Sequence, residues 1–410
     1  MTKKLKKIDS RLAGLIEKEI ERQKFTIDLI PSEAIAPKGV LEVLGSPLIN
    51  KYSEGGIGRR YYPGNKYIDK IEDLAKKRAK EVFGLGKNWE VNVQLLSGTP
   101  ANLAVYFGLC NPRDRIMGMS LFSGGHLSHG HPVSLSGKIF NSITYNSGKN
   151  GYLDFGHIEK IAKKYKPKII ISGFSAYPRK VNFKKFYQIA KEVNAYHMAD
   201  ISHIAGLVAA GVHPSPFRYA DIVTTTCHKT LNGPRAAIIF YRKELTEKID
   251  KAVFPGIQGG PHNNKVAAIA LSLKIAKTAA FKNTMKQIVK NAKTLAEELK
   301  KYGFNLITNG TDTHLMLIDL RNKNISGKEA EKMLEKAGIL VNRNAILEDK
   351  KPYNPSGIRP GTWSVSFRKM REKEMRKIAN WIADIIDKKR NPTEVRKEVV
   401  ELCKKFPLPY

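Results

Sequence analysis

Short apolar runs alternate with amphipathic segments over the middle of the chain. A helical pattern covers residues 68–83, and strand-length apolar runs follow at 91–95, 115–119, 139–145, 168–172, 195–199, 221–225 and 236–241. Such runs, rich in β-branched residues and separated by helical stretches, are typical of a mostly parallel sheet with helices on both faces. The pattern therefore predicts a large α/β domain at residues 68–275, built on a mostly parallel seven-stranded sheet.

Different patterns flank this segment. Residues 8–24 have the spacing of an amphipathic helix, and a Gly-, Pro- and Tyr-rich stretch follows, so we expect an N-terminal arm with interface loops over residues 1–67. A long helical pattern at 265–302 has a break near Phe281 and ends before Gly303. Beyond it we expect strands at 304–308, 314–319 and 363–367 and helices at 327–337 and 371–388. Residues 276–410 should thus form a smaller C-terminal α+β domain.

The charge balance introduces a second kind of partner. The chain has 71 lysines and arginines against 38 aspartates and glutamates, a formal net charge of +33. A strongly basic chain attracts nucleic acid, at least nonspecifically. The lysines are scattered along the chain and no nucleic-acid-binding motif accompanies them, so this charge fits solvated helix faces equally well. A basic protein with a nucleic-acid-binding role stays an alternative.

The cysteines and the hydropathy pattern indicate a compartment. Cys110, Cys227 and Cys403 lie far apart and match no metal or redox spacing, which is typical of a reducing cytosol. No apolar run approaches the roughly 20 residues that a membrane-spanning helix needs, and no export signal is visible. We expect a cytoplasmic protein that makes no membrane contact and has no thiolate metal site.

The most informative motif surrounds a lysine between two predicted strands. Lys229 follows His228 in the short segment that joins the runs at 221–225 and 236–241. A lysine held by sheet structure can be desolvated and poised to form a Schiff base with a carbonyl cofactor. Taken alone, an ordinary turn lysine is the commoner explanation.

Three further motifs precede this lysine. Asp200 ends a predicted strand, with His203 three residues on, and a carboxylate there could pair with a pyridinium nitrogen. The segment 97–102 ends a strand and opens a helix, whose free backbone donors suit a phosphate group. His126 lies in a Gly- and His-rich segment and could stack on a flat ring. Simple capping roles explain Asp200 and segment 97–102 about equally well.

A metal site is a rival for the histidines. His126, His129, His131 and Asp200 have side chains that zinc accepts as ligands. That assignment leaves Lys229 and the phosphate-binding segment without a purpose. A phosphate site, a stacking histidine, an acidic strand end and a lysine, in this order, are the parts that a pyridoxal-phosphate enzyme requires, and we expect no metal.

At this point the chain resembles the serine hydroxymethyltransferase family. The resemblance runs from about residue 25 to about residue 407 through Leu29-Ile-Pro-Ser-Glu33, Asn50-Lys-Tyr-Ser-Glu54-Gly55, Gly58-Arg-Arg-Tyr-Tyr62, Gly124-Gly-His-Leu-Ser-His-Gly130, Gly173-Phe-Ser-Ala-Tyr177, Thr224-Thr-Thr-Cys-His-Lys-Thr230, Val253-Phe-Pro-Gly-Ile-Gln-Gly-Gly-Pro261 and Ser356-Gly-Ile-Arg359. It implies the fold type I of pyridoxal-phosphate-dependent transferases. It also implies a homodimer with shared active sites, while a tetramer stays open.

The resemblance assigns roles residue by residue. The catalytic set is Lys229, which would carry pyridoxal 5'-phosphate covalently, with Glu54 as acid/base, Tyr62, His228 and Thr226. The remaining cofactor contacts are Ser97, Gly98, Thr99, His126, Ser175, Asp200, His203, Tyr52 and Gly260, of which Tyr52 and Gly260 would come from the other subunit. Arg359 would clamp the substrate carboxylate, with Ser32, Tyr62 and His203 as further substrate contacts. The folate pocket would comprise Leu121, Gly125, Leu127 and Asn344.

The implied reaction is the reversible conversion of L-serine and tetrahydrofolate to glycine and 5,10-methylenetetrahydrofolate. A folate-independent aldolase acting on threonine or other β-hydroxy amino acids would share Lys229, Asp200 and Arg359, and it stays an alternative. The chain departs from the family pattern at Ala34, Leu96, Thr99-Pro100, Cys227, Lys351-Pro-Tyr353 and Trp363-Ser364. The last two departures bear on the surroundings of the folate.

Overall fold

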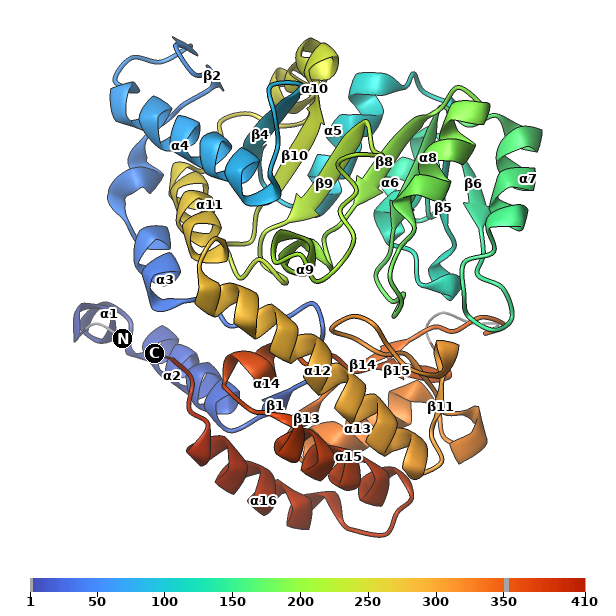
Figure 1. The fold of residues 1–410 in the computed structure, drawn as a ribbon. Helices are drawn as coiled ribbons and strands as arrows, with labels where there is room; N and C mark the ends of the chain where they lie inside the picture. Colours follow the sequence, from blue (N-terminus) through green and yellow to red (C-terminus); the bar gives the residue numbers. More distant parts are fainter. Residues whose placement is uncertain (1–2, 350–353, 410) are drawn as a thin grey trace.

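The centre of the molecule is a seven-stranded sheet (Figure 1). In spatial order its strands are β4 (Trp89–Leu95), β10 (Ala237–Arg242), β9 (Ile222–Thr226), β8 (Tyr196–Asp200), β7 (Ile169–Gly173), β5 (Arg115–Met119) and β6 (Asn141–Tyr145). Only β10 runs antiparallel to its neighbours β4 and β9, and the other pairs are parallel. All seven predicted strands are present close to their expected bounds, and the predicted fold class is confirmed.

Both faces of this sheet are buried, which explains the continuous apolar runs. Along β10, Ile238 and Phe240 belong to one core cluster, while Ile239 and Tyr241 belong to the cluster on the opposite face. The first cluster includes residues of α4 (Lys66–Phe83), α7 (Phe155–Tyr165), α8 (Phe183–Glu192) and α11 (Asn263–Ala276). The second includes residues of α5 (Gly98–Leu109) and α10 (Thr246–Lys251). A strand between two helical layers has no solvent face, so polar alternation disappears from its sequence.

A second core lies toward the C-terminus. Its sheet has the order β11 (Asn305–Leu306), β12 (Ile318–Asp319), β15 (Gly357–Arg359) and β14 (Asn342–Asn344). It packs with α13 (Gly327–Lys336), α15 (Glu372–Ile386) and α16 (Pro392–Lys405). The N-terminal strand β1 (Ile27–Asp28) pairs with β13 (Ile339–Leu340), so the start of the chain joins this core.

The second half of the long helical stretch connects the two cores. The predicted helical stretch at 265–302 consists of α11 and α12 (Ala279–Lys301), and the break falls at Thr278, whose hydroxyl accepts a hydrogen bond from the Phe281 amide. Met285 of α12 packs in the core of the large sheet, whereas Leu295 packs in the C-terminal core. The predicted domain boundaries at residues 67/68 and 275/276 stay predictions.

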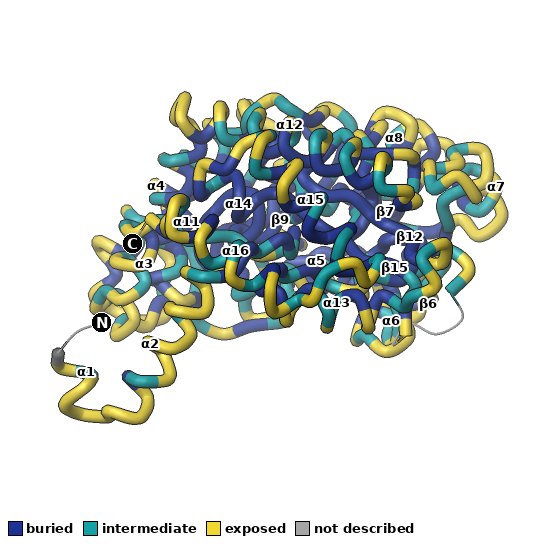
Figure 2. Tube along the Cα trace, turned by 90° about the horizontal axis from the view of Figure 1, so that it is seen from below, coloured by how far each residue is buried: buried dark blue, intermediate teal, exposed yellow. Residues whose placement is uncertain are grey.

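The structure is a computed structural model, and it describes residues 3–349 and 354–409. Figure 2 shows that α1 (Lys3–Ile8) and the adjoining part of α2 (Ser10–Lys24) project from the body of the molecule with largely exposed surfaces. Within the described ranges, no helix has the length and apolar character needed to cross a membrane.

Some expectations for the C-terminal part are wrong. Residues 363–367 form a helix, α14 (Trp363–Phe367), instead of a strand. The alternation of Trp363, Val365 and Phe367 with serines has the period of a strand, but both serines are buried and hydrogen-bonded, Ser364 to Asp28 and Ser366 to the Thr362 carbonyl oxygen. Because the serines are satisfied inside the protein, they carry no signal of a solvent-exposed face. The predicted strands at 304–308 and 314–319 shrink to β11 and β12, and α16 was not predicted.

Arg368 ties three distant segments of this core together. Its guanidinium donates to the carbonyl oxygens of Thr26 (2.9 Å), Lys24 (2.9 Å), Cys403 (3.0 Å) and Phe406 (2.6 Å). Arg368 directly follows α14, and its side chain is buried, so these carbonyl groups are shielded from water. One fixed guanidinium therefore satisfies the end of α2 and the end of α16 at the same time.

We predict that Arg368→Met destabilises the fold. Methionine keeps much of the buried volume but leaves four carbonyl oxygens without their donor, a cost on the order of 3 kcal/mol. The urea concentration at the unfolding midpoint, measured at fixed protein concentration, should fall clearly. The urea midpoint of Arg368→Lys should lie between those of the wild type and Arg368→Met. An unchanged midpoint for Arg368→Met would contradict the role of Arg368 as a clamp.

Candidate active site

A cavity of about 440 Å³ opens at the carboxyl ends of the central strands. It is lined by Ser32, Glu33, Ser97, Gly98, Thr99, Asn102, His126, His129, Phe174, Ser175, Asp200, Ser202, His203, Thr226, His228, Lys229 and Arg235. Strands β8 and β9 end at Asp200 and Thr226, on the rim of this cavity. Open α/β sheets bind their ligands at this edge.

Lys229 enters the cavity from the hairpin that joins β9 to β10. The hairpin is pinned by hydrogen bonds between Cys227 and Ala236 (2.9 Å) and between Gly233 and Cys227 (2.8 Å). The Lys229 side chain is 9% exposed, and its ammonium group has no hydrogen bond or ion pair with any described residue. Burial lowers the pKa of Lys229 to about 8, although the Asp200 carboxylate opposes this shift. A buried amine with a lowered pKa and no partner is poised to react as a nucleophile.

Asp200 supplies the negative charge of the cavity. Its Oδ2 accepts hydrogen bonds from Asn102 (2.9 Å) and from the His129 ring (3.0 Å), and its Oδ1 accepts one from the Ser202 amide (3.0 Å). Burial alone would raise the pKa of this carboxyl, but these hydrogen bonds outweigh burial and hold the pKa of Asp200 well below its usual range. The carboxylate therefore stays ionised although it is buried, and it can pair with a protonated ring nitrogen.

Three histidines around the cavity, His126, His203 and His228, are neutral. Burial lowers the pKa of His126 to about 4 and that of His228 to about 3, and it lowers the pKa of His203 far below the usual value. The Nδ1 atom of His126 accepts a hydrogen bond from the Ser128 amide (3.1 Å), which fixes the ring. The buried Nδ1 atoms of His203 and His228 have no hydrogen-bond partner in the part of the chain that the structure describes.

The start of α5 offers an anion site. Ser97 caps this helix without a side-chain hydrogen bond, and Gly98 and Thr99 contribute the first amide groups. A Cβ atom at Gly98 would stand 2.6 Å from the Thr226 methyl group, so the helix start lies directly against the end of β9. Free amide groups and the positive end of the helix dipole together suit a phosphate group.

These observations fit pyridoxal phosphate. The unpartnered amine of Lys229, the ionised Asp200, the neutral ring of His126 and the α5 anion site meet in one cavity of suitable size. Each lies on a different element, as the sequence predicted. Among the described residues, no three His, Cys, Asp or Glu side chains converge as metal ligands would.

Arg359 lies beside the cavity. Its side chain is buried at the end of β15, and burial lowers its pKa to about 10. The guanidinium donates to Asn342 Oδ1 through Nε (3.2 Å) and Nη2 (3.1 Å), and through Nη1 to the Ser175 carbonyl oxygen. An arginine has five N–H groups, so one remains on each terminal nitrogen. These two donors can hold a carboxylate in a bidentate fashion.

Several predicted residues do not line this cavity. Tyr52 and Tyr62, which flank Glu54 in the chain, pack against each other with their ring centroids 5.0 Å apart. Gly260 comes from a distant segment and lies against the Tyr52 ring. The folate candidates lie elsewhere: Leu121 and Leu127 in short 3-10 turns, Gly125 between those turns, and Asn344 in β14, where its side chain donates to the Ala345 carbonyl oxygen. The candidate residues therefore fall into three groups: those that line the cavity, those near Glu54, and the folate candidates.

Sequence reasoning missed several members of the site. Asn102 and Ser202 hold Asp200 in place, Asn342 holds Arg359, and Glu33, Phe174 and Arg235 line the cavity. The sequence indicated His129 only as a rival metal ligand beside Asp200, whereas its ring is hydrogen-bonded to that carboxylate. Asn102 lies five residues after Ser97 in the same helix, so the helix that starts at the phosphate segment could have indicated it. Nothing in the sequence pairs Asn342 with Arg359, because that contact forms only when β14 and β15 align.

Two of the departures from the family pattern lie among the internal contacts of the chain. Cys227 is buried in the core at the lysine hairpin, and Ser364 donates to the half-buried carboxylate of Asp28. The departure at 351–353 lies outside the described residues.

The lowered pKa of Lys229 leads to a test. With a pKa of about 8, about a quarter of the chains carry the reactive neutral amine at pH 7.5, against about 0.1% for an ordinary lysine. The rate at which the apoprotein takes up pyridoxal phosphate, followed by visible absorbance, should rise with pH and level off above about 8.

Two variants should displace this profile in opposite directions. Asp200→Asn removes a charge that raises the pKa of Lys229, whereas Arg359→Leu removes one that lowers it. The titration of the cofactor itself is common to all variants, so the displacement reports on the lysine. A wild-type profile that levels off only near pH 10, or no displacement in either variant, would contradict this assignment.

Comparison with known proteins agrees with this geometry. The family model described as serine hydroxymethyltransferase matches residues 5–382. The chain is also 51% identical over 409 residues to the serine hydroxymethyltransferase of Desulfotalea psychrophila (strain LSv54 / DSM 12343), a match that covers 99% of this chain and 96% of that relative. On the combined strength of the fold, the lysine site and both matches, this chain belongs to the serine hydroxymethyltransferase family.

Proposed function

We propose a specific division of roles among the residues of this chain in the serine hydroxymethyltransferase reaction. The family is pyridoxal-phosphate-dependent and reversibly converts L-serine and tetrahydrofolate to glycine and 5,10-methylenetetrahydrofolate. The observation that carries the assignment is the buried, unpartnered amine of Lys229 in the same cavity as the ionised Asp200.

The cavity residues hold and orient the cofactor. Lys229 would attach the cofactor covalently, Asp200 would keep a proton on its ring nitrogen, and His126 would stack on its ring. Ser97, Gly98 and Thr99 would bind its phosphate, while Ser175, His203, Thr226 and His228 would surround its ring. When bound, the cofactor supplies an electron-withdrawing ring that stabilises the negative charge left when the Cα–Cβ bond of serine breaks.

The substrate is held at the rim. The two free N–H groups of Arg359 bind the amino-acid carboxylate, with Ser32 and His203 beside it. Because Asn342 already occupies the side edge of the guanidinium, we expect the carboxylate at its end, across Nη1 and Nη2.

Glu54 and Tyr62 complete the site from a second copy of the chain. Glu54 handles the proton of the serine hydroxyl or of the folate nitrogen, and Tyr52 and Gly260 reach the phosphate region of the neighbouring cavity. Homodimers are typical of this family. The exposed apolar side chains Ile8, Leu12, Leu15, Tyr61 and Tyr67 support burial of the arm and this loop in such an assembly.

Folate binding and location complete the proposal. Leu121, Gly125, Leu127 and Asn344 line the folate pocket, for which the exposed side chain of Leu127 provides apolar surface. The widely separated buried cysteines agree with a cytoplasmic protein.

We predict that Glu54→Gln separates cofactor binding from turnover. Glutamine keeps the size of the side chain but cannot take up a proton, so folate-dependent formation of glycine from serine should fall by about 100-fold or more. The visible absorbance of bound pyridoxal phosphate should be unchanged. Full folate-dependent activity of the variant would refute the acid/base role. If the variant cleaves serine without folate as fast as the wild-type protein turns it over, that result would favour the aldolase alternative.

Shared sites predict complementation between two inactive chains. When Lys229→Ala and Glu54→Gln chains carry different affinity tags and mixed dimers are purified, one site of each dimer has both an intact Lys229 and an intact Glu54. Mixed dimers should therefore recover about half of the wild-type activity, although each parent is inactive. No recovery would mean that both residues serve the same cavity from one chain.

A further inference from the structure

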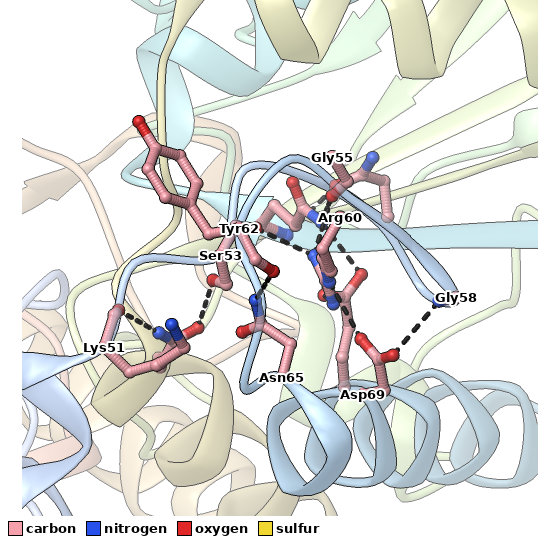
Figure 3. A network of polar contacts seen from close by, with 12 residues as sticks. Lys51, Ser53, Gly55, Gly58, Arg60, Tyr62, Asn65 and Asp69 are labelled. Atoms are coloured by element: carbon pink, nitrogen blue, oxygen red, sulfur yellow. Dashed lines mark hydrogen bonds and ion pairs between the residues drawn. The ribbon is translucent and has the colours of Figure 1, made fainter.

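The loop that carries Glu54 has an unusually complete set of backbone contacts (Figure 3). The carbonyl oxygen of Lys51 accepts from Asn263 (2.6 Å), that of Tyr52 from Asn65 (3.3 Å), and that of Glu54 from the Tyr61 amide (3.1 Å). The carbonyl oxygens of Ser53 and Gly55 both accept from Arg60 (2.9 and 2.7 Å). Five consecutive peptide groups are therefore fixed from outside the segment 51–55.

Arg60 links this segment to α4. Its Nε donates to Asp69 (2.8 Å) and its Nη2 to Glu72 (2.6 Å), both on that helix, while Nη1 holds the two loop carbonyl oxygens. The side chain is only 4% exposed. Gln94 of β4 supports the arrangement, because its amide donates to Glu72 (3.0 Å) and to the Gly55 carbonyl oxygen (3.1 Å). One guanidinium thus grips the peptide groups on both sides of Glu54 and anchors them to a helix.

The side chains of Tyr52, Glu54 and the nearby Tyr62 make no hydrogen bond to any described residue, whereas Ser53 is buried and donates to Asn263 Oδ1 (2.6 Å). Tyr52 is 54% and Tyr62 is 44% exposed. The Glu54 carboxylate has no hydrogen bond or ion pair with any residue in the described ranges 3–349 and 354–409. A rigid backbone with unengaged side chains suits a group of residues that acts on something outside its own chain.

We propose that Arg60 is a positioning residue for Glu54, and that it sets where this carboxylate lies in the cavity of the partner subunit. This inference rests on the proposed role of Glu54 and adds the element that fixes it. Displacing a catalytic group by about 1 Å can cost on the order of 100-fold in rate. Lysine cannot reproduce the clamp, because one ammonium group does not reach two carboxylates and two carbonyl oxygens in a fixed planar fork.

The first test separates turnover from binding. In the Arg60→Lys variant, kcat for the folate-dependent reaction should fall by roughly 10- to 100-fold, while the KM for serine and the absorbance of bound pyridoxal phosphate change little. Arg368→Lys is the matched control, because it weakens another buried arginine clamp far from the loop and should leave kcat unchanged. Wild-type kcat in Arg60→Lys, or an equal loss of kcat in both variants, would overturn the proposal.

The second test asks in which subunit Arg60 acts. Mixed dimers of Arg60→Lys with Lys229→Ala should recover about half of the wild-type activity, since one cavity receives an intact loop from the partner. Mixed dimers of Arg60→Lys with Glu54→Gln should not recover, because every cavity receives a defective loop. The opposite pattern would show that Arg60 serves the cavity of its own chain and would overturn the proposal.

The proposed function and this inference fail differently. If Glu54→Gln does not complement Lys229→Ala, the proposal of a shared site is wrong. If Glu54→Gln does complement Lys229→Ala but Arg60→Lys gives a different result in the same pairings, only the role of Arg60 is wrong. Should Arg60→Lys chains fail to form folded dimers, Asp69→Asn replaces them in the same pairings. That variant removes one anchor of the guanidinium and should lower kcat in the same direction by a smaller factor, and wild-type kcat there would count against the clamp.

Discussion

The ionised carboxylate of Asp200 is the constraint on which the site depends. A buried carboxylate costs several kcal/mol unless hydrogen bonds replace its water. Here Asn102, His129 and the Ser202 amide replace it. Further hydrogen bonds fix the segments that carry two of these donors: Thr224 donates to Asn102 (2.8 Å), and Tyr106 donates to the carbonyl oxygen of Ser128 (3.0 Å), which precedes His129. The requirement to keep one charge ionised therefore extends through α5, β8 and β9.

The residues around Lys229 and those around Glu54 are fixed by different physical means. Around Lys229, strand ends and a tight hairpin position the side chains, and a buried core supports them from below. Around Glu54 there is no comparable strand, because β2 (Gly55–Gly56) and β3 (Arg59–Arg60) form only a short ribbon. Polar side chains that hold individual carbonyl oxygens replace the sheet there. Such a loop keeps its outer face free for contact with another subunit, which a strand inside a sheet could not do.

The sequence predicted the large sheet well and the surroundings of the site less well. Runs such as 168–172 are recognisable because burial on two faces leaves them mostly apolar. Lys229, Asp200 and His126 were found because their chemistry is unusual at strand ends and glycine-rich turns. Asn342 and Arg60 were not, since their partners come together only in the folded chain. The error at 363–367 has the same origin, because Ser364 and Ser366 find their partners on distant segments.

Burial and the charges around the cavity explain why His126, His203 and His228 are neutral and which ligands the cavity accepts. Burial comes first, but Lys229 and Arg359 both add to the lowering of the pKa of His203, as His129 and Lys229 do for His126. A third cation, Arg235, also lines the cavity, whose carboxylates are those of Asp200 and Glu33. An excess of positive charge in a partly buried space favours ligands that bring several negative charges. A phosphate group and an amino-acid carboxylate supply such charges, and neutral imidazoles can then stack or accept protons without competing for them.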